Sequence, residues 1–294
     1  MAPEQPAPPE SCVTVVVVTY NSAHCVGALA QDLKHLPHVV VVDNASADDT
    51  VRRLEAELPQ AVVLSNPENR GFGAANNRAL ARATTPYALL LNPDCRLPPG
   101  GLRRMVAYAQ NNPGTAVVAP QLVNGDGQPE VNYRWPSTLW ASRGPGADGP
   151  CCVGFACGAC LLVDVQVMRS VGFFDESFFL YYEDDDLCLR TFHQHLPMVV
   201  LPDVQAVHTS RGSVGGRHRW RSEYWRGYHH AQSKWRYTHK HLGAEAAEAL
   251  RRRVLWLACL ALPLRLLLPA PRHVGRLWGR IQGLRLINPS STTL

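Results

Sequence analysis

Residues 12–22 read Cys-Val-Thr-Val-Val-Val-Val-Thr-Tyr-Asn-Ser, an apolar and largely β-branched run that ends in polar side chains. A continuous run of this kind is typical of a strand that is buried on both faces of a parallel sheet. Residues 39–42 and 87–91 repeat the pattern, and segments with helical spacing separate the runs. Strands that alternate with helices at this pace predict an α/β fold with a mostly parallel sheet flanked by helices.

Polar clusters follow three of these strands, at residues 19–22, 43–46 and 92–94. Ligands of open α/β sheets bind outside the carboxyl ends of the strands, so the clusters predict a binding site there. Asp43 is placed to bond a ribose or a base, or to cap the helix that follows it. Asp94 is placed to hold a divalent cation, although Asn-Pro-Asp also makes a good turn.

Three further motifs each allow a functional and a structural interpretation. Gly71-Phe72-Gly73 can cradle phosphate or simply begin a helix, and it lacks the third glycine of a dinucleotide fingerprint. That absence argues against a nicotinamide-dependent oxidoreductase. A lone histidine more often has a structural role than a ligand role, but His208 follows an apolar strand and precedes a polar loop, which adds support for a metal or phosphate contact. Cys157 and Cys160 lie in an apolar strand, where free cysteine packs as a small hydrophobic residue.

Four consecutive acids, at residues 183–186, exceed what capping a helix requires. Asp186 can pair with Arg190 one helical turn later. Asp185 is expected to be solvated or to cap the helix. Glu183 and Asp184 then lie at the first turn, where one carboxylate can act as a general base.

The formal charge of +5 hides a strong asymmetry. Residues 1–210 carry 13 Lys and Arg against 21 Asp and Glu, whereas residues 211–294 carry 16 against 3. We therefore expect a flexible leader at 1–11, a catalytic domain at 12–215 and a basic amphipathic helical region at 216–294. Nine cysteines in apolar surroundings and no visible signal peptide favour the reducing cytosol.

The helical region contains an apolar stretch at 254–270 that Pro263 and Arg265 interrupt, with arginines on both sides. It is too short and too interrupted to span a bilayer, but it suits an interfacial membrane anchor. The alternative is a helical hairpin that packs on the rest of the chain or on a second subunit of a homodimer. No nucleic-acid-binding motif accompanies the basic residues, so nucleic acid is not an expected partner. The predicted location is the cytoplasmic face of the cell membrane.

Taken in order, these motifs resemble the family 2 glycosyltransferases with the GT-A fold over about residues 12–215. The Asn-Pro-Asp motif at 92–94 and the FFDE…EDxDLxxR motif at 173–190 most resemble those of bacterial rhamnosyltransferases that use dTDP-L-rhamnose. Galactofuranosyl, glucosyl and other sugar transferases share the pattern. The matching segments are 15–22 (VVVVTYNS), 40–50 (VVVDNASADDT), 66–80 (NPENRGFGAANNRAL), 89–94 (LLLNPD), 158–162 and 172–190 (GFFDESFFLYYEDDDLCLR).

The resemblance implies a nucleotide-sugar pocket and a metal site. Asp94 and His208 would hold Mg²⁺ or Mn²⁺ against the donor diphosphate. Asn92 stands where the family's Asp-x-Asp motif has its first acid, which leaves the metal site with one negative charge fewer. The implied donor-binding residues are Thr19, Tyr20, Asn21, Asp43, Arg70, Gly71, Asn92 and Asp94.

The resemblance also implies the reaction. Asp184 would be the catalytic base, with Glu183 hydrogen-bonding near the acceptor. The base would remove a proton from a hydroxyl of a lipid-linked or glycan acceptor, and that hydroxyl would displace the nucleotide diphosphate with inversion. Such an enzyme would serve cell-wall or polysaccharide assembly. A non-catalytic nucleotide-sugar-binding scaffold is the competing hypothesis, against which the set of Asp94, Glu183, Asp184 and His208 argues.

Overall fold

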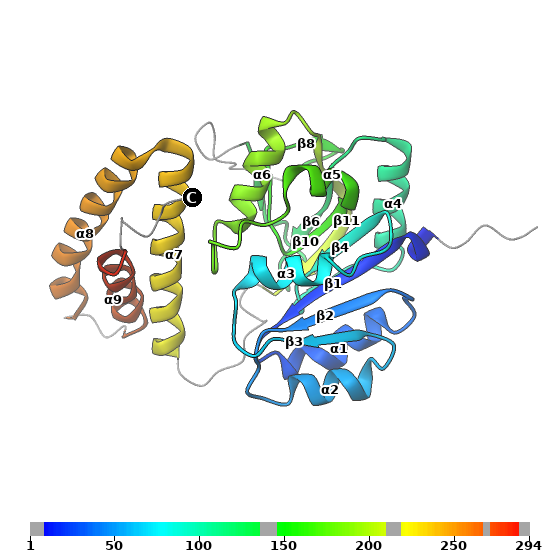
Figure 1. The fold of residues 1–294 in the computed structure, drawn as a ribbon, viewed down its shortest axis with the longest axis horizontal. Coiled ribbons are helices and arrows are strands. Elements are labelled where there is room, and N and C mark those ends of the chain that lie inside the picture. Colours follow the sequence, from blue (N-terminus) through cyan, green and yellow to red (C-terminus); the bar gives the residue numbers. More distant parts are fainter. Residues whose placement is uncertain (1–8, 136–145, 210–218, 267–270, 288–294) are drawn as a thin grey trace, which may run out of the picture. The chain divides into compact units, whose positions relative to one another are not determined.

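The computed structural model describes residues 9–135, 146–209, 219–266 and 271–287 (Figure 1). The chain divides into two compact units. The sheet unit comprises Met1–Asp175 and Asp184–Gly215, and the helical unit comprises Glu176–Glu183 and Gly216–Leu294. Most of the expected leader lies outside the described residues.

The sheet unit alternates strands and helices through its amino-terminal half, as the apolar runs predict. The last part of the expected leader belongs to a short 3-10 helix, η1, and Glu10 in it forms an ion pair of 3.0 Å with Arg103. The elements are η1 (Pro9–Cys12), β1 (Val13–Thr19), α1 (Ala23–Leu33), β2 (Val39–Asp43), α2 (Thr50–Glu57), β3 (Val62–Ser65), α3 (Phe72–Leu80), β4 (Tyr87–Leu91), β5 (Cys95–Arg96), α4 (Gly101–Asn111), β6 (Val117–Val123), β7 (Tyr133–Arg134), β8 (Cys151–Cys152), β9 (Phe155–Ala156), β10 (Cys160–Asp164), α5 (Val165–Val171), α6 (Glu183–His193) and β11 (Met198–His208).

Nine of these strands form one mixed sheet in the order β3-β2-β1-β4-β10-β6-β11-β5, with β8 also paired to β11. Strands β1 to β4 run parallel, and the register places Thr19 beside Asp43 at their carboxyl ends. β10 is antiparallel to β4, so its first residue, Cys160, pairs with the last residue of β4, Leu91. This reversal brings the start of β10 to the edge of the sheet where the polar loops emerge.

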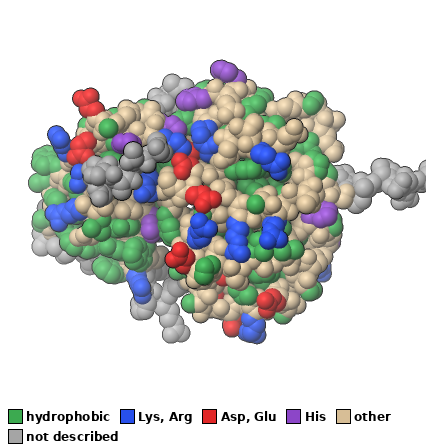
Figure 2. All heavy atoms as spheres, viewed as in Figure 1, with side chains coloured by type: hydrophobic (Ala, Val, Ile, Leu, Met, Phe, Trp, Pro, Cys, Tyr) green, Lys and Arg blue, Asp and Glu red, His purple; other side chains and the backbone are tan. Residues whose placement is uncertain are grey.

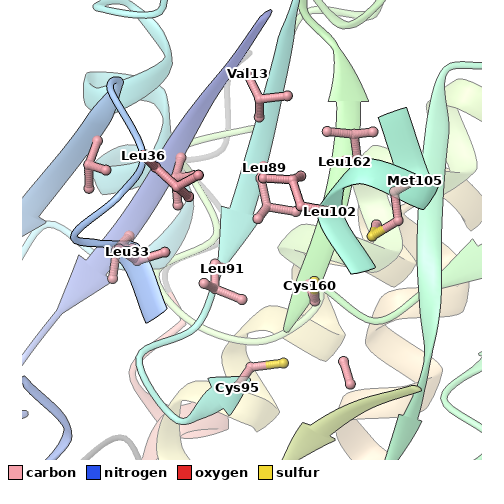
Figure 3. Packing of buried hydrophobic residues seen from close by; sticks show 14 of the residues in the cluster. Val13, Leu33, Leu36, Leu89, Leu91, Cys95, Leu102, Met105, Cys160 and Leu162 are labelled. Atoms are coloured by element: carbon pink, nitrogen blue, oxygen red, sulfur yellow. The ribbon is translucent and has the colours of Figure 1, made fainter. Parts of the chain in front are cut away.

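The core lies on both faces of the sheet because alternate residues of each strand point to opposite sides. Val15 and Val17 pack on one face against α1, α2 and α4, and Figure 3 shows part of this cluster around Leu89 and Met105. Val16 packs on the other face against α3, α5 and α6. Both faces are thus covered, which explains why β1 is an unbroken apolar run instead of an alternating one.

Two segments differ from the sequence-based prediction. The apolar runs at 198–201 and 205–208 predict two short strands, but the structure has the single strand β11, with an irregularity between Leu201 and Gln205. β11 persists because it pairs with β5, β6 and β8 at once. Residues 124–149 are rich in Gly, Pro, Asn and Trp, which predicts a long loop, but β7 interrupts this segment and pairs with β9. Residues 136–145 of that loop lie outside the described residues.

The helical unit contains α7 (Arg219–Leu242), α8 (Ala244–Leu266) and α9 (Pro271–Arg285). Helices α7 and α9 pack with their backbones close together along a stripe of glycines. A Cβ atom added at Gly279 would lie 2.0 Å from the carbonyl oxygen of Tyr224, and one at Gly283 would lie 2.5 Å from that of Tyr228. None of the described helices is long and apolar enough to cross a membrane.

The segment Glu176–Glu183 packs on α7, a position that the sequence did not indicate. Phe179 stacks on His229 with ring centroids 4.4 Å apart, and the Ser233 hydroxyl donates a hydrogen bond of 2.8 Å to the carbonyl of Leu180. Tyr181 and Tyr182 both adopt left-handed backbone conformations here. The aromatic run before the four acids therefore serves the packing of the helical unit.

Candidate functional site

The loops after β1 and β2 are tied together at the polar edge of the sheet. The Thr19 hydroxyl donates to Asp43 over 3.0 Å, and both the amide and the hydroxyl of Ser46 donate to the same carboxylate. The side chain of Asn21 accepts a hydrogen bond of 2.8 Å from the amide of Ala47. Asp43 is almost fully buried, so one of its functions is to hold these two loops in a fixed shape.

A second hydrogen-bonded group continues this edge toward α3. The amide group of Asn44 donates 2.9 Å to the carbonyl of Gly71, and its oxygen accepts from the backbone amide of Arg70 over 3.1 Å and from Asn66 over 2.8 Å. Gly71 has a φ of 88°, a conformation that glycine adopts without strain. Asn44 therefore fixes the entry into α3, a role that the sequence analysis did not assign.

The end of β4 carries Asn92 and Asp94, and the fold brings His208 beside them. β5 pairs with the end of β11, placing His208 opposite Cys95, the neighbour of Asp94. The Nε2 atom of His208 lies 3.7 Å from Oδ1 of Asp94, and both side chains are largely buried. Thr209 reinforces this junction by donating 3.2 Å hydrogen bonds to the carbonyl of Asp94.

This pair fits part of a divalent-cation site. A carboxylate and an imidazole are both ligands for Mn²⁺, and Mg²⁺ is commonly held by one or two carboxylates together with substrate phosphates. Among the described residues, none hydrogen-bonds to the buried Nδ1 of His208. The described residues contain no cluster of three His, Cys, Asp or Glu side chains suited to a metal. Donor oxygens and water would have to supply the remaining ligands.

The four acids begin α6 and have distinct environments. Asp186 is fully buried and forms the expected ion pair with Arg190, over 2.8 Å. The same guanidinium also donates to the carbonyls of Val171 and Phe173. Glu183 is buried at the first position of the helix. Arg190 therefore joins α6 to the chain that leads into the acidic stretch.

Asn77 of α3 holds that preceding chain from the other side. Its amide nitrogen donates 2.9 Å to the carbonyl of Phe174, and its oxygen accepts 3.1 Å from the amide of Phe174. Phe72 packs edge-on against the ring of Phe174. These contacts join segments 97 residues apart in sequence and fix the chain just before the acids.

Asp184 is the acid that faces the start of β10. The backbone amides of Gly158 and Asp185 donate to its two oxygens over 3.1 and 3.0 Å. A Cβ atom at Gly158 would lie 3.4 Å from the Cβ of Asp184, so a larger side chain would crowd the carboxylate. Burial raises the pKa of Asp184, and the two amides act in the opposite direction. A carboxylate with a raised pKa and a fixed orientation has the properties of a general base.

Asp185 is neither solvated nor simply capping the helix, which corrects the sequence-based expectation. It forms an ion pair with Arg134 of β7, whose guanidinium also lies 3.7 Å from the ring centroid of Phe155. Burial and the charge of Asp184 raise the pKa of Asp185 to about 6, although Arg134 opposes the shift. The sequence analysis missed Arg134 because its strand lies within a segment expected to be a loop.

The structure groups the sequence-derived residues along one edge of the sheet. Thr19, Asn21 and Asp43 share one hydrogen-bonded network, and Asn44 ties Arg70 and Gly71 to it. The amide of Asn92 donates 2.9 Å to the carbonyl of Ala159, the residue after Gly158. This link connects the end of β4 to the loop that orients Asp184. Tyr20 is exposed, and its backbone amide bonds Ser22.

Comparisons with known proteins identify the family of the chain. Residues 14–172 match the family model described as glycosyl transferase family 2. The chain is 25% identical over 209 residues to the low-salt glycan biosynthesis hexosyltransferase Agl10 of Haloferax volcanii, covering 67% of this chain and 66% of that protein. It is 26% identical over 238 residues to the N-acetylglucosaminyl-diphospho-decaprenol L-rhamnosyltransferase of Mycobacterium tuberculosis, covering 68% and 77%.

Solved structures support the fold. The mannosyltransferase PcManGT from Pyrobaculum calidifontis, in complex with GDP-Man and Mn²⁺, is similar with a TM-score of 0.54 and 19% identity, covering 93% of this chain and 85% of that one. GalNAc-T7, solved with UDP, GalNAc and Mn²⁺, is similar with a TM-score of 0.55 and 14% identity, covering 76% and 50%. The architecture is the GT-A fold predicted from the motifs.

Proposed function

This chain belongs to glycosyl transferase family 2, and from that premise we propose that it transfers L-rhamnose from dTDP-L-rhamnose to a hydroxyl of a lipid-linked or glycan acceptor. The sheet unit supplies the site through the polar edge described above. The reaction is a single displacement at the anomeric carbon, which inverts its configuration.

The environment of Asp184 is the observation that carries the proposal. Its carboxylate is held by two backbone amides and has a raised pKa, so it is oriented and basic enough to accept a hydroxyl proton. Asp185 is engaged by Arg134, and Asp186 is engaged by Arg190. Of the three aspartates, Asp184 is thus the one whose contacts leave it suited to proton transfer, and Glu183 is proposed to orient the acceptor.

The donor site is proposed along the loops after β1, β2 and β4. Asp43 and its hydrogen-bonded neighbours would support the nucleoside, and Arg70 and Gly71 would lie near the nucleotide. The mycobacterial relative, a rhamnosyltransferase by name, supports rhamnose as the sugar and a diphospho-lipid as the acceptor class. Galactofuranosyl, glucosyl or another sugar is the alternative within the family.

A divalent cation is proposed at Asp94 and His208. When bound there, Mg²⁺ or Mn²⁺ would offset the negative charge that develops on the departing diphosphate. Asn92 provides an amide where an acid would add a second charge. Both solved neighbours contain Mn²⁺, which supports the choice of metal for the fold.

The basic helical region is proposed to hold the protein on the cytoplasmic face of the membrane. Residues 211–294 carry 16 Lys and Arg against 3 acids, and Trp256, Leu257 and Leu260 expose apolar side chains on α8. Anionic vesicles at low salt should sediment the protein. Recovery of a soluble dimer with no vesicle binding would assign those side chains to a second copy of the chain instead.

Replacement of the proposed base tests the function. We expect Asp184→Asn to reduce sugar transfer by at least about a hundredfold while donor binding persists, since general-base catalysis contributes about 10²–10⁴-fold. Asp203→Asn, which removes an exposed carboxylate of β11, is the matched control. Full transfer activity in Asp184→Asn would refute the assignment.

A thermal-shift screen tests the donor and separates an enzyme from a binding scaffold. dTDP-rhamnose with Mn²⁺ should raise the melting temperature more than UDP- or GDP-sugars do, because a ligand that binds the native state stabilises it. A preference for a UDP- or GDP-sugar would replace rhamnose with that sugar. Donor binding with neither transfer nor hydrolysis, for every sugar nucleotide tried, would favour the scaffold.

A further inference from the structure

Helices α8 and α9 line an open cavity of about 430 Å³ in the helical unit. Its walls combine two kinds of side chain. Five are small or apolar and four are basic: Val254, Leu257, Ala258, Ala261 and Leu277, with Arg265, His273, Arg276 and Arg280. Among the described residues, no carboxylate lines the cavity. The chemistry of the walls therefore favours a ligand that is both anionic and apolar.

The basic side chains of the cavity are poorly compensated within the described residues. Arg280 has no ion pair with any described carboxylate, and burial followed by the nearby charge of Arg276 lowers its pKa. Arg276 has a carboxylate nearby, since its Nε lies 3.9 Å from Glu223, but the two groups form no hydrogen bond through Nε. Among the described carboxylates, only Glu223 lies near the partly buried guanidiniums of Arg276 and Arg280, and Arg226 also pairs with it. An anion in the cavity would therefore relieve the repulsion between Arg276 and Arg280.

The other acids of the carboxyl-terminal region do not offset this charge. Glu248 pairs with Arg251 and Arg252, at 3.2 and 3.7 Å. Glu245 is exposed in the first turn of α8, well before the cavity-lining part of that helix begins at Val254. Of the 16 Lys and Arg residues of 211–294, three line the cavity, and Glu223 is the one described carboxylate within ion-pair distance of any of these three.

An apolar surface continues from the cavity along α8. Leu257, a lining residue, is 47% exposed, and its neighbours Trp256 and Leu260 are 64% and 54% exposed. Trp278 of α9 is 38% exposed. Figure 2 shows hydrophobic and basic side chains intermixed on the helical unit. Tryptophan beside arginine is typical of the boundary between lipid headgroups and acyl chains.

We propose that the cavity between α8 and α9 binds the phosphate group of a membrane lipid, with Arg265, Arg276 and Arg280 as its ligands and the lipid chain lying along the apolar face of α8. This inference rests on the proposed membrane association and is independent of the donor sugar. A phosphate monoester, diester or diphosphate offers the same oxygens to arginine, so a bilayer phospholipid and a lipid-linked acceptor are the two sources of this chemistry.

The test compares two double variants that each remove two positive charges from the helical unit. Arg265→Gln with Arg280→Gln alters the cavity, whereas Arg252→Gln with Arg253→Gln alters exposed arginines of α8 outside it. Binding of dihexanoyl phosphatidic acid below its micelle concentration is measured by titration calorimetry, with farnesyl diphosphate as a second probe. Inorganic phosphate and farnesol report the phosphate and the chain alone, and circular dichroism confirms folding.

We expect the cavity variant to bind both lipid probes at least about tenfold more weakly, and the exposed variant to bind them within about twofold of the unmodified protein. Tighter binding of farnesyl diphosphate would identify the acceptor as the source, and equal binding would identify any lipid phosphate. Equal losses in both variants, or binding of phosphate as tight as that of the lipids, would overturn the site. Sugar transfer to a water-soluble acceptor should be unchanged in both variants, so loss of this site and failure of the proposed transferase activity give different results.

Discussion

Arg134 offers a quantitative test of how the acidic helix is tuned. It is the cationic partner of Asp185, and its charge also acts on Asp184. Replacing it with glutamine keeps a polar side chain of similar length but removes the charge. Both aspartates would then hold their protons more tightly. Since the proposed base must be ionised to act, activity in Arg134→Gln should require a higher pH.

The size of the shift follows from the geometry. Two unit charges about 4 Å apart interact by about 4 kcal/mol at an effective dielectric constant of about 20. The side chains of Arg134 and Asp185 are 23% and 15% exposed, so water screens part of this interaction. We expect one-third to two-thirds of this energy of about 4 kcal/mol to appear as a change in the pKa of the carboxylates, which corresponds to about 1–2 pH units. Starting from a pKa of about 6 for Asp185, the paired carboxylates would then titrate near neutral pH or above.

The assay is the pH dependence of kcat/KM between pH 5 and 9 with the donor identified by thermal shift. The acidic limb of the profile for Arg134→Gln should move up by about 1–2 units. Activity at pH 7 should fall about two- to tenfold and recover at pH 9. Arg134→Lys, which keeps the charge, should leave the limb close to its original position. Arg52→Gln, which breaks an exposed ion pair with Asp49, controls for loss of an arginine.

A uniform loss of activity at every pH would refute this reasoning. That result would mean that Arg134 contacts a substrate or supports the loop, and that its charge does not set the protonation of the acids. An unchanged profile would show that Asp185 is not coupled to the base.

Three further outcomes follow from the packing. Gly279→Ala should destabilise the helical unit by about 1–3 kcal/mol, because the new methyl group would overlap a carbonyl of α7; thermal unfolding by circular dichroism measures this loss. Burial lowers the pKa of His229 and His230 to about 4, below the ordinary value of 6.5. The unfolded chain therefore takes up protons first, so the stability of the helical unit should be full above pH 6.5 and decrease as the pH falls toward 4. Tryptophan fluorescence should report this change, since five of the seven tryptophans lie in α7–α9. Asn77→Ala removes both hydrogen bonds to Phe174 and should lower kcat more than it raises KM, as steady-state kinetics would show.

The central strands of the sheet unit could be predicted because they are buried on both faces. Continuous β-branched runs such as Val13–Thr19 and Val39–Asp43 leave little choice of structure. β11 was harder, since Pro202 and Asp203 suggest a break within it. The pairing of β11 with three other strands outweighs that local signal, and pairing between distant segments does not appear in a local pattern.

The candidate site also contains some contacts that the sequence predicts and others that it does not. The Asp186–Arg190 pair was predictable because helical spacing alone brings the two side chains together, and the structure confirms it. The partner of Asp185 was not predictable, because Arg134 lies 51 residues away and reaches it only through the pairing of β7 with β9. Asn77 and Asn44 were missed for a similar reason, since their hydrogen bonds join segments that only the folded chain brings close.

The glycine stripe of α9 has a mechanical consequence for the cavity beside it. Because α9 meets α7 through backbone atoms, with no side chains between them to rearrange, the separation of these two helices is fixed. α8 is joined to α7 through Gly243, whose φ of 91° makes a sharp turn, and little buried core holds it in place. We therefore expect the α9 wall of the cavity to be the more rigid one, and a wider ligand to displace α8 rather than α9, against the hydrogen bond of 2.9 Å from Arg251 to the carbonyl of Leu284.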